Sequence, residues 1–398
     1  MASVVTTVRE NVRLLNQRAI LQAIHRRGQV SRSELAAELH LSPAAVTHIT
    51  ASLIEKGVVY EARAGTSQSV GRKPILLEID YNHAHVLGVK LSSAAVITTL
   101  TNLKAEVRAS RIDELTAVQP EVVLDVIQGA TKALLQDALI TPETLVGIGF
   151  SLPGIIEPST GTCRYSALLD WEDVPIGDLL KNRFELLTFV DNDVNALTAA
   201  EAWFGQGEKH RNFLVVTLGR GVGLGVVIDG TVYRGARGGA GEFGHLAIDP
   251  EGPRCTCGNR GCLEAYLADE ALLRWAQERV PALSDGGPNA LVALADSGDV
   301  DARALYKEAG QLLGRGLSGL VNIFAPSLIV LSGEGMRAAR HFLPATRAAL
   351  KAHSFGDLFE HTELVVDSWG DDAWARGAAG LAASQYLLEI AAVSGGES

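Results

Sequence analysis

The sequence predicts a winged helix-turn-helix over residues 1–80, followed by a larger α/β body with two lobes. Two capped helical patterns precede residue 57, and strand patterns then flank a basic loop that ends at residue 74. From residue 84 apolar strands alternate with amphipathic helices, as in layered α/β folds. A chain of 398 residues, 47% hydrophobic and 20% charged, is long enough for two or three domains.

The first part of the chain contains three predicted helices. Apolar residues that share one face predict a helix over residues 10–26. The segment SRSE at 31–34 has the form of a capping box, in which a serine caps an amide and a glutamate reaches back. Ser42 and Pro43 then begin a helix that ends at Gly57. Two short helices joined by a tight turn are typical of a helix-turn-helix.

The predicted wing is a hairpin of two strands, residues 58–62 and 75–79. Its loop ends in the basic sequence GRKP at 71–74, so Arg72 and Lys73 are candidates for contact with a minor groove or with phosphate. A solvated basic loop is the alternative for these two residues. A plain three-helix bundle is the alternative for the whole region, but it leaves the wing unexplained.

The second helix of a helix-turn-helix enters the major groove with its N-terminal outer face. Here that face offers Ala44, Ala45, Thr47 and His48. Alanine and the threonine methyl group suit a thymine methyl group, and His48 can bind a base or a phosphate. Arg32, which begins the preceding helix, is a candidate phosphate contact.

The charge of the chain is unevenly distributed. The net charge is −11, yet residues 1–80 carry ten Lys and Arg against seven Asp and Glu, and residues 81–398 carry 25 against 39. A mildly basic head on an acidic body fits a DNA-binding module joined to a regulatory domain. An excess of three positive charges also arises by chance, so the charge alone decides little.

The body consists of apolar strands and amphipathic helices. Strands are predicted at residues 85–91, 94–101, 105–111, 144–150, 186–191, 212–218 and 222–228. Helices are predicted at residues 119–138, 175–184, 302–324, 338–352 and 372–391. The hairpin patterns near 85–111 and 212–233 indicate two related lobes. We assign residues 81–195 and the helix at 372–391 to the first lobe, and residues 196–371 to the second.

Three of the four cysteines, Cys255, Cys257 and Cys262, lie within eight residues. No apolar run is long enough for a membrane helix, and the N-terminus lacks a secretory pattern, so we expect a cytoplasmic protein without membrane contact. In that compartment clustered cysteines indicate a metal rather than a disulfide. With His245 they complete a closed tetrahedral shell for a structural zinc ion. Free core cysteines and a core histidine are the alternative, but C-x-C-x4-C flanked by glycines is a poor core pattern.

A second group of polar residues has the chemistry of a sugar site. Asn192 and Asp193 stand where a strand ends and a helix begins, and an amide beside a carboxylate suits vicinal hydroxyl groups. A helix N-cap is the alternative, and either Asn192 or Asp191 could provide it. Glu242 and Glu264 flank the cysteine segment, and His245 can offer the ring nitrogen that the metal does not use.

With these residues assembled, the chain resembles the ROK family of repressors and sugar kinases over nearly its whole length. The most specific part of the resemblance is GEFGH at 241–245 followed by CTCGNRGCLE at 255–264. The resemblance implies a two-lobed body related to hexokinase and actin, and it implies zinc binding by His245 and the three clustered cysteines. It implies sugar binding by five residues: Asn192, Asp193, Glu242, His245 and Glu264. Asp193 matches the position of the kinases' catalytic base.

The chain departs from the kinase members in its phosphate loops. ROK kinases open the first lobe with a strand and then Asp-x-Gly-Gly-Thr, whereas residues 88–94 here read GVKLSSA, with Lys90 at the position of the aspartate. Residues 218–223 keep three glycines but carry Arg220 where kinases have a small hydroxyl residue. Without glycine the backbone cannot approach a phosphate as closely, so we expect no kinase activity.

The resemblance and the residues together predict a repressor of carbohydrate-metabolism genes, controlled by a small sugar inducer bound between the two lobes. A homodimer or a dimer of dimers is expected on a palindromic operator, because two recognition helices one DNA turn apart read a palindrome. One alternative is an active ATP-dependent sugar kinase with an appended DNA-binding domain. Another is a module that docks on a protein. The sequence leaves the sugar open among glucose, xylose, N-acetylglucosamine and small oligosaccharides.

Overall fold

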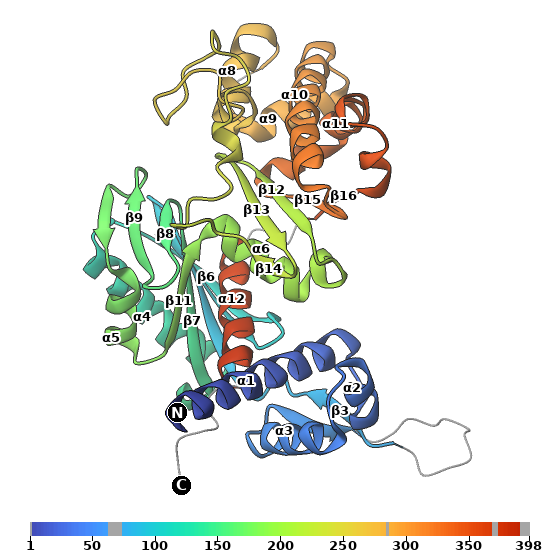
Figure 1. The fold of residues 1–398 in the computed structure, drawn as a ribbon. Helices are drawn as coiled ribbons and strands as arrows, with labels where there is room; N and C mark the ends of the chain where they lie inside the picture. The colour runs from blue at the N-terminus through green and yellow to red at the C-terminus, as the bar shows by residue number, and fades with distance from the viewer. Residues whose placement is uncertain (1, 63–73, 284–285, 368–372, 391–398) are drawn as a thin grey trace. The chain divides into compact units, whose positions relative to one another are not determined.

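The computed structural model describes residues 2–62, 74–283, 286–367 and 373–390 (Figure 1). The chain divides into two compact units. The first unit contains the chain up to Phe150, Ile176–Val190 and the chain from Ala378 onward. The second unit contains Ser151–Pro175 and Asp191–Gly377. The predicted division at residues 80, 195 and 371 stays a prediction.

The N-terminal part of the first unit is a winged helix-turn-helix, as the sequence predicts. Its elements are α1 (Ala2–Arg27), β1 (Val30–Ser31), α2 (Arg32–Glu38), α3 (Pro43–Glu55), β2 (Val59–Ala62) and β3 (Leu76–Ile79). The strands form an antiparallel sheet in the order β1-β3-β2. Arg72 and Lys73, at the predicted tip of the wing, lie outside the described residues.

The predicted caps of the helix-turn-helix are present. The Glu34 backbone N–H donates to Ser31 Oγ at 3.3 Å, and the Ser31 backbone N–H donates to Glu34 Oε2 at 2.8 Å. At the next helix the Ala45 N–H donates to Ser42 Oγ at 3.2 Å, and Pro43 takes the first position. These bonds satisfy amides that a helix start leaves without partners, so they fix where α2 and α3 begin.

The rest of the first unit is an α/β sandwich around a five-stranded sheet in the order β11-β7-β4-β5-β6. Its strands are β4 (His85–Leu91), β5 (Ala95–Asn102), β6 (Val107–Glu114), β7 (Leu145–Leu152) and β11 (Leu187–Asn192). Its helices are α4 (Pro120–Asp137), η1 (Pro142–Thr144), α5 (Ile176–Phe184) and α12 (Ala373–Ile390). Gly149 lets α12 pack directly on β7, because a Cβ at this position would clash with the Ala378 carbonyl.

The second unit has its own five-stranded sheet in the order β14-β13-β12-β15-β16. Its strands are β12 (Phe213–Leu218), β13 (Val222–Ile228), β14 (Thr231–Val232), β15 (Leu328–Ser332) and β16 (Glu363–Val366). The strand β12 pairs antiparallel with β13 and parallel with β15, which pairs parallel with β16. A smaller sheet of β8 (Ile155–Glu157), β9 (Thr162–Ser166) and β10 (Trp171–Val174) lies in the same unit.

The helices of the second unit pack an apolar core against its five-stranded sheet. They are α6 (Asp193–Phe204), η2 (Gln206–Lys209), η3 (Phe243–His245), α7 (Glu264–Leu267), α8 (Asp269–Arg279), α9 (Gly287–Ser297), α10 (Val300–Phe324), η4 (Glu334–Ala338), α11 (Ala339–His353) and η5 (Leu358–His361). Gly310 and Gly314 let α10 approach α11 closely, because a Cβ at either position would clash with a backbone carbonyl of α11. No helix in the described parts of the chain is long and apolar enough to span a membrane.

Candidate functional site

The outer face of α3 carries the predicted base-reading residues. Val46, Ile49 and Leu53 are buried on the inner face, whereas Ala44, Thr47 and His48 are exposed. The Thr47 hydroxyl donates to the Pro43 carbonyl at 2.8 Å, so its donor is used within the helix. An exposed, weakly charged face of small side chains fits a major groove.

Arg32 has a structural task within the helix-turn-helix. Its Nε donates to Thr50 Oγ1 at 3.0 Å, and its Nη2 lies 2.9 Å from Glu61 Oε1. The guanidinium therefore ties the start of α2 to α3 and to β2. A phosphate at Arg32 would have to share the guanidinium with Glu61, so a DNA contact by this residue stays a prediction.

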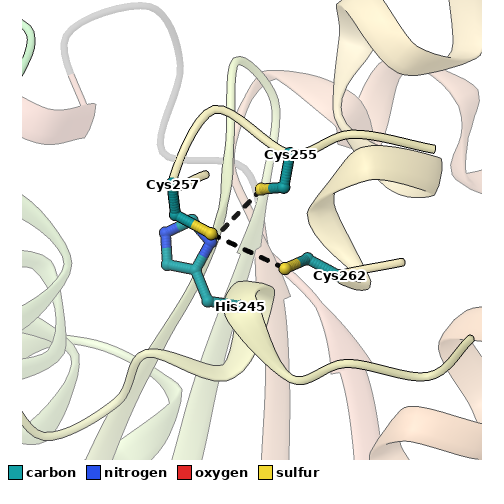
Figure 2. Close-up of side chains that lie close together, drawn as sticks. All are labelled: His245, Cys255, Cys257 and Cys262. Atoms are coloured by element: carbon teal, nitrogen blue, oxygen red, sulfur yellow. Dashed lines mark hydrogen bonds between the residues drawn. The ribbon is translucent and has the colours of Figure 1, made fainter. Parts of the chain in front are cut away.

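His245, Cys255, Cys257 and Cys262 gather in one cluster (Figure 2). One ligand atom from each residue lies within 4.8 Å of the others. The Cys255 Sγ is 3.5 Å from His245 Nδ1, and the Cys257 Sγ is 3.7 Å from Cys262 Sγ. All three are free thiols, and a disulfide would need a much shorter separation of about 2.05 Å.

Two glycines shape the loop that carries the thiols. Gly258 and Gly261 have φ angles of +92° and +65°, and a Cβ on Gly261 would clash with the Asp249 carbonyl. The Cys255 N–H donates to the Asn259 carbonyl at 2.8 Å, which closes the turn. Glycine is required here because other residues avoid positive φ. The turn brings the thiols toward His245.

The cluster fits a tetrahedral zinc ion. Metal–sulfur bonds of about 2.3 Å give sulfur–sulfur edges of roughly 3.8 Å in a regular tetrahedron, close to the edge between Cys257 and Cys262. Burial and the neighbouring thiols raise the pKa of Cys262 to about 12. A bound cation would oppose that rise, because metal ligation stabilises the thiolate. The donor set of three sulfurs and one imidazole leaves no open position.

Asn192 caps α6, which was the alternative to sugar binding. Its Oδ1 accepts from the Val194 N–H at 2.9 Å, and its Nδ2 donates to the Gly154 carbonyl at 3.0 Å. One amide hydrogen of Asn192 is not used by these two bonds. Asp193 follows at the first position of the helix, half-buried. The sugar-binding role of both residues stays a prediction.

Three carboxylates share one neighbourhood with His245. Partial burial raises the pKa of Glu242, and the negative charges of Glu264 and Asp193 raise it further, whereas His245 lowers it. The His245 Nε2 lies 3.8 Å from Glu242 Oε2, and its Nδ1 faces the thiol of Cys255. The imidazole therefore turns one nitrogen toward the thiol of Cys255 and the other toward the Glu242 carboxylate.

Glu264 joins the cysteine-bearing loop to the β12–β13 turn. Its Oε2 accepts from the Val222 N–H at 3.0 Å, and its Oε1 accepts from the Thr256 hydroxyl at 3.3 Å. A Cβ on Gly221 would lie 2.8 Å from the same carboxylate. Glu264 is thus held on two sides by the protein before any ligand arrives.

The β4–β5 and β12–β13 turns, which are predicted to differ from kinase phosphate loops, also differ from each other in geometry. In the β4–β5 turn Ser92 N–H donates to the Ala95 carbonyl at 2.9 Å, and the Ala95 N–H donates to Ser92 Oγ at 3.1 Å. In the β12–β13 turn a Cβ on Gly219 would clash with the Glu334 carboxylate, which also accepts from Trp374 Nε1 at 3.0 Å. The first turn bonds to itself, and a negative charge lies beside the second.

Sequence reasoning did not single out Arg234, and it considered Asp191 only as an alternative cap of α6. Asp191 is 2% exposed, and its Oδ2 accepts from Arg234 Nε at 2.7 Å. Polar residues in the run DND at a strand end were a signal for such a buried carboxylate, but nothing in the sequence indicates its distant partner. Trp171 is 4% exposed and belongs to the core.

The fold and the clusters define a winged helix-turn-helix protein whose body has a sugar-kinase-like architecture. A family model described as the ROK family matches residues 86–385, and one described as winged helix-turn-helix DNA-binding matches residues 13–60. The chain belongs to the ROK family.

Curated relatives and solved structures agree with this assignment. A putative xylose repressor from Caldicellulosiruptor sp. strain Rt8B.4 is 32% identical over 392 residues, which cover 94% of this chain and 97% of the relative. A crystal structure of a ROK family transcriptional regulator, a homologue of the E. coli MLC protein, has a TM-score of 0.84 at 26% identity over 96% of this chain and 100% of that one. A ROK family glucokinase from Streptomyces griseus, in complex with glucose and AMPPNP, has a TM-score of 0.67 at 26% identity over 75% and 99%.

Proposed function

We propose that the chain is a sugar-responsive transcriptional repressor of carbohydrate-metabolism genes. The observation that carries the proposal is the position of His245, which turns one nitrogen to the cysteine cluster and the other to Glu242 beside Asp193 and Glu264. Such a group suits sugar hydroxyls, and the same chain presents an exposed recognition helix. The names of the repressor relatives support the same conclusion.

At the sugar site, carboxylates accept hydrogen bonds and the amide donates one. Asp193 and Glu242 would each accept from a sugar hydroxyl, and the unused amide hydrogen of Asn192 would donate to another. His245 Nε2 would bind a further hydroxyl. Glu264 would accept from a hydroxyl while the Val222 amide and Thr256 hold it in place.

Zinc is the metal that best suits the four-ligand cluster of His245, Cys255, Cys257 and Cys262. When bound, it would supply structure rather than a reactive water, because the four ligands close its shell. The ring of His245 would then be fixed with Nε2 toward the sugar. The loop of residues 245–264 would be held as one piece.

At the DNA, we propose that α3 enters the major groove, with Ala44, Thr47 and His48 toward base edges. Arg32, Arg72 and Lys73 are proposed as phosphate or minor-groove contacts. A homodimer or a dimer of dimers would place two such helices on a palindromic operator.

We further propose that the chain is not an active kinase. The Ser92 turn has no glycine and bonds to itself, and the Glu334 carboxylate beside Gly219 would repel a phosphate. The retained Asp193 and the glycine-bearing turn after β12 favour the second candidate, an ATP-dependent sugar kinase. A coupled ADP-release assay with hexoses and pentoses distinguishes the two: turnover above the no-sugar background would establish the kinase.

Coupling between the sugar and DNA sites would run through α12. This helix belongs to both units, with Trp374 bound to Glu334 in the second unit. In the first unit its Ile390 carbonyl accepts from Lys56 Nζ at 2.6 Å, one residue beyond α3. A change at the sugar site that shifts α12 would therefore reach the recognition helix. Thermodynamic linkage requires DNA to alter sugar affinity by the same factor.

Thermal melting against a panel of D-xylose, D-glucose and N-acetyl-D-glucosamine, with and without Mg-ATP, tests the proposal first. A rise with one sugar that ATP does not extend supports a sugar-responsive regulator, because a ligand that binds only the folded state stabilises it. A further rise that requires both sugar and ATP favours the kinase. No rise with any sugar contradicts sugar control by these three compounds.

A further inference from the structure

An ion pair between a buried carboxylate and a half-buried guanidinium joins two segments that carry the proposed sugar ligands. Asp191 lies near the end of β11 with 3% of its side chain exposed, and Arg234 lies just after β14 with 21% exposed. The Arg234 Nε is 2.7 Å from Asp191 Oδ2. Burial raises the pKa of Asp191, and the charge and hydrogen bond of Arg234 counteract that rise.

Asp191 fixes the segment that holds the Asn192–Asp193 pair. Its Oδ1 accepts from the Asn192 N–H at 2.9 Å and from Asn195 Nδ2 at 3.1 Å. Asn195 is buried in the first turn of α6, at 4% exposure. The carboxylate thus sets the direction in which β11 passes into α6, and with it the positions of Asn192 and Asp193.

Arg234 fixes the segment that leads to Glu242 and His245. Its Nη1 donates to the Val232 carbonyl at 3.2 Å, and its own carbonyl accepts from the Ala240 N–H at 3.2 Å. The segment from Arg234 to Glu242 is closely packed. A Cβ on Gly238 would clash with the Ile156 carbonyl, and a Cβ on Gly241 would clash with the Leu224 carbonyl. A displacement of Arg234 would therefore be passed along to Glu242 instead of being absorbed on the way.

We infer that the Asp191–Arg234 pair is a positioning device that sets the separation between Asn192–Asp193 and Glu242–His245, and so determines which arrangement of sugar hydroxyls the site accepts. The inference rests on the proposed sugar-binding function. Neither side chain is required to touch the sugar. The pair acts through the backbone segments that it joins.

The contacts of Arg234 require the geometry of a guanidinium group. Arginine uses Nε for Asp191 and Nη1 for Val232 at the same time, in a planar geometry that the single ammonium group of lysine cannot reproduce. Loss of Arg234 would also leave Asp191 as a buried carboxylate without a cation, which is strongly unfavourable. Arg234→Lys therefore tests geometry, and Arg234→Met tests charge and geometry together.

The experiment measures the binding of D-xylose, D-glucose and N-acetyl-D-glucosamine by calorimetry on the full chain, with metal content and operator affinity as parallel readouts. We expect Arg234→Lys to weaken the best sugar of the panel by about tenfold or more, as with other groups that orient a ligand-bearing side chain. Metal content and operator affinity without sugar should stay as in the unaltered protein. Arg340→Met, which removes the Arg340–Asp296 pair of the same unit, is the matched control and should keep sugar affinity.

A double variant separates positioning from simple stabilisation. Asp191→Asn with Arg234→Met removes both buried charges, so it should recover much of the melting temperature that Arg234→Met alone loses. Positioning predicts that the double variant still binds the best sugar weakly and that the order of preference among the three sugars changes. Recovery of sugar affinity together with stability would overturn the inference, and so would an Arg234→Lys protein with unaltered affinities.

A further comparison separates failure of this inference from failure of the proposed function. If Asp193→Asn abolishes sugar binding while Arg234→Lys leaves it intact, the sugar site stands and the positioning role is wrong. If the unaltered protein binds none of the three sugars, the inference fails for these compounds, and if Asp193→Asn binds them normally, the proposed sugar site fails and the inference fails with it.

Discussion

The helices α3 and α6 begin in similar ways, but α3 presents an exposed face with few polar bonds, whereas α6 begins inside a hydrogen-bonded network. Each starts at a polar cap, Ser42 for α3 and Asn192 for α6. On the exposed face of α3, Ala44 has no polar group and the Thr47 hydroxyl bonds to the backbone of the same helix. The residues around Asn192 lie in a network that contains the buried Asp191 carboxylate, the Arg234 guanidinium and the Gly154 carbonyl.

This difference indicates how each helix recognises its partner. The face of α3 matches a large, regular surface, so its contacts are nearly independent and each contributes a modest amount. We propose that the start of α6 binds a small molecule, for which a shift of a fraction of an ångström in one group matters. Its groups are cross-linked, and one substitution should affect several of them. Single changes near α6 and the metal cluster should therefore have larger effects than single changes on α3.

The largest effect should follow Cys257→Ala. Removal of one of four ligands should release the metal and free His245 and the loop up to Glu264, so the sugar-induced rise in melting temperature should disappear. Metal analysis and thermal melting measure both losses. Cys163→Ala changes a buried cysteine outside the cluster and should keep the metal. Unchanged metal content in Cys257→Ala would show that the cluster is not the metal site.

Asp193→Ala should abolish the sugar response while operator binding without sugar persists. Loss of a charged hydrogen bond to a hydroxyl costs about 1.5–3 kcal/mol, or roughly 10- to 150-fold in sugar affinity. Calorimetry with the best sugar measures this loss. Asp229→Ala, an exposed carboxylate paired with Arg211 in the same unit, is the control. A normal sugar response in Asp193→Ala would remove this residue from the site.

His48→Ala should have a smaller and more local effect. If His48 reads a base, operator affinity should fall by about 1–3 kcal/mol and selectivity should relax at one base pair. If it contacts phosphate, the loss should be uniform across sequences, and the slope of affinity against salt should decrease. Binding assays with an operator selected from random DNA by the protein itself, at several salt concentrations, distinguish these outcomes. If His48→Ala and the unaltered protein have the same affinity for each DNA sequence at each salt concentration, His48 does not contact DNA. Glu55→Gln, at the other end of α3, is the control.

Ser42→Ala should have the smallest effect of the set. It removes the side chain that accepts from the Ala45 amide and should lower the stability of the winged helix by about 1 kcal/mol. Chemical denaturation followed by circular dichroism measures the change. Ser42→Asp retains a capping oxygen and should remain close to the unaltered protein. Equal loss in both variants would mean that the cap does not set the stability of α3.

The same contrast explains how much the sequence could predict. The caps at Ser31 and Ser42, the wing strands and the cysteine cluster depend on residues close together in the chain, and their spacing indicates the structure. The predicted start of α1 near residue 10 was late, since the helix begins at Ala2. The first signals of that helix lie in VVTTV, whose β-branched residues disfavour a helical prediction.

Other features depend on residues far apart in the chain. The Asp191–Arg234 pair and the bond from Val222 to Glu264 bring together residues separated by 43 and 42 positions. No periodicity indicates such partners. The strands β8 to β10 were not predicted because they are short and carry polar residues such as Arg164 and Glu172, so they lack an apolar pattern. They pair antiparallel with one another, in the order β10-β9-β8.

The central claim is that one chain couples a sugar site to a recognition helix. The most direct test titrates the selected operator against the full chain at zero and saturating sugar, and titrates the sugar with and without operator. We expect saturating sugar to weaken operator binding by about 5- to 150-fold, and operator to weaken sugar binding by the same factor. Operator affinity that does not change in the presence of a sugar that binds and stabilises the protein would contradict the account.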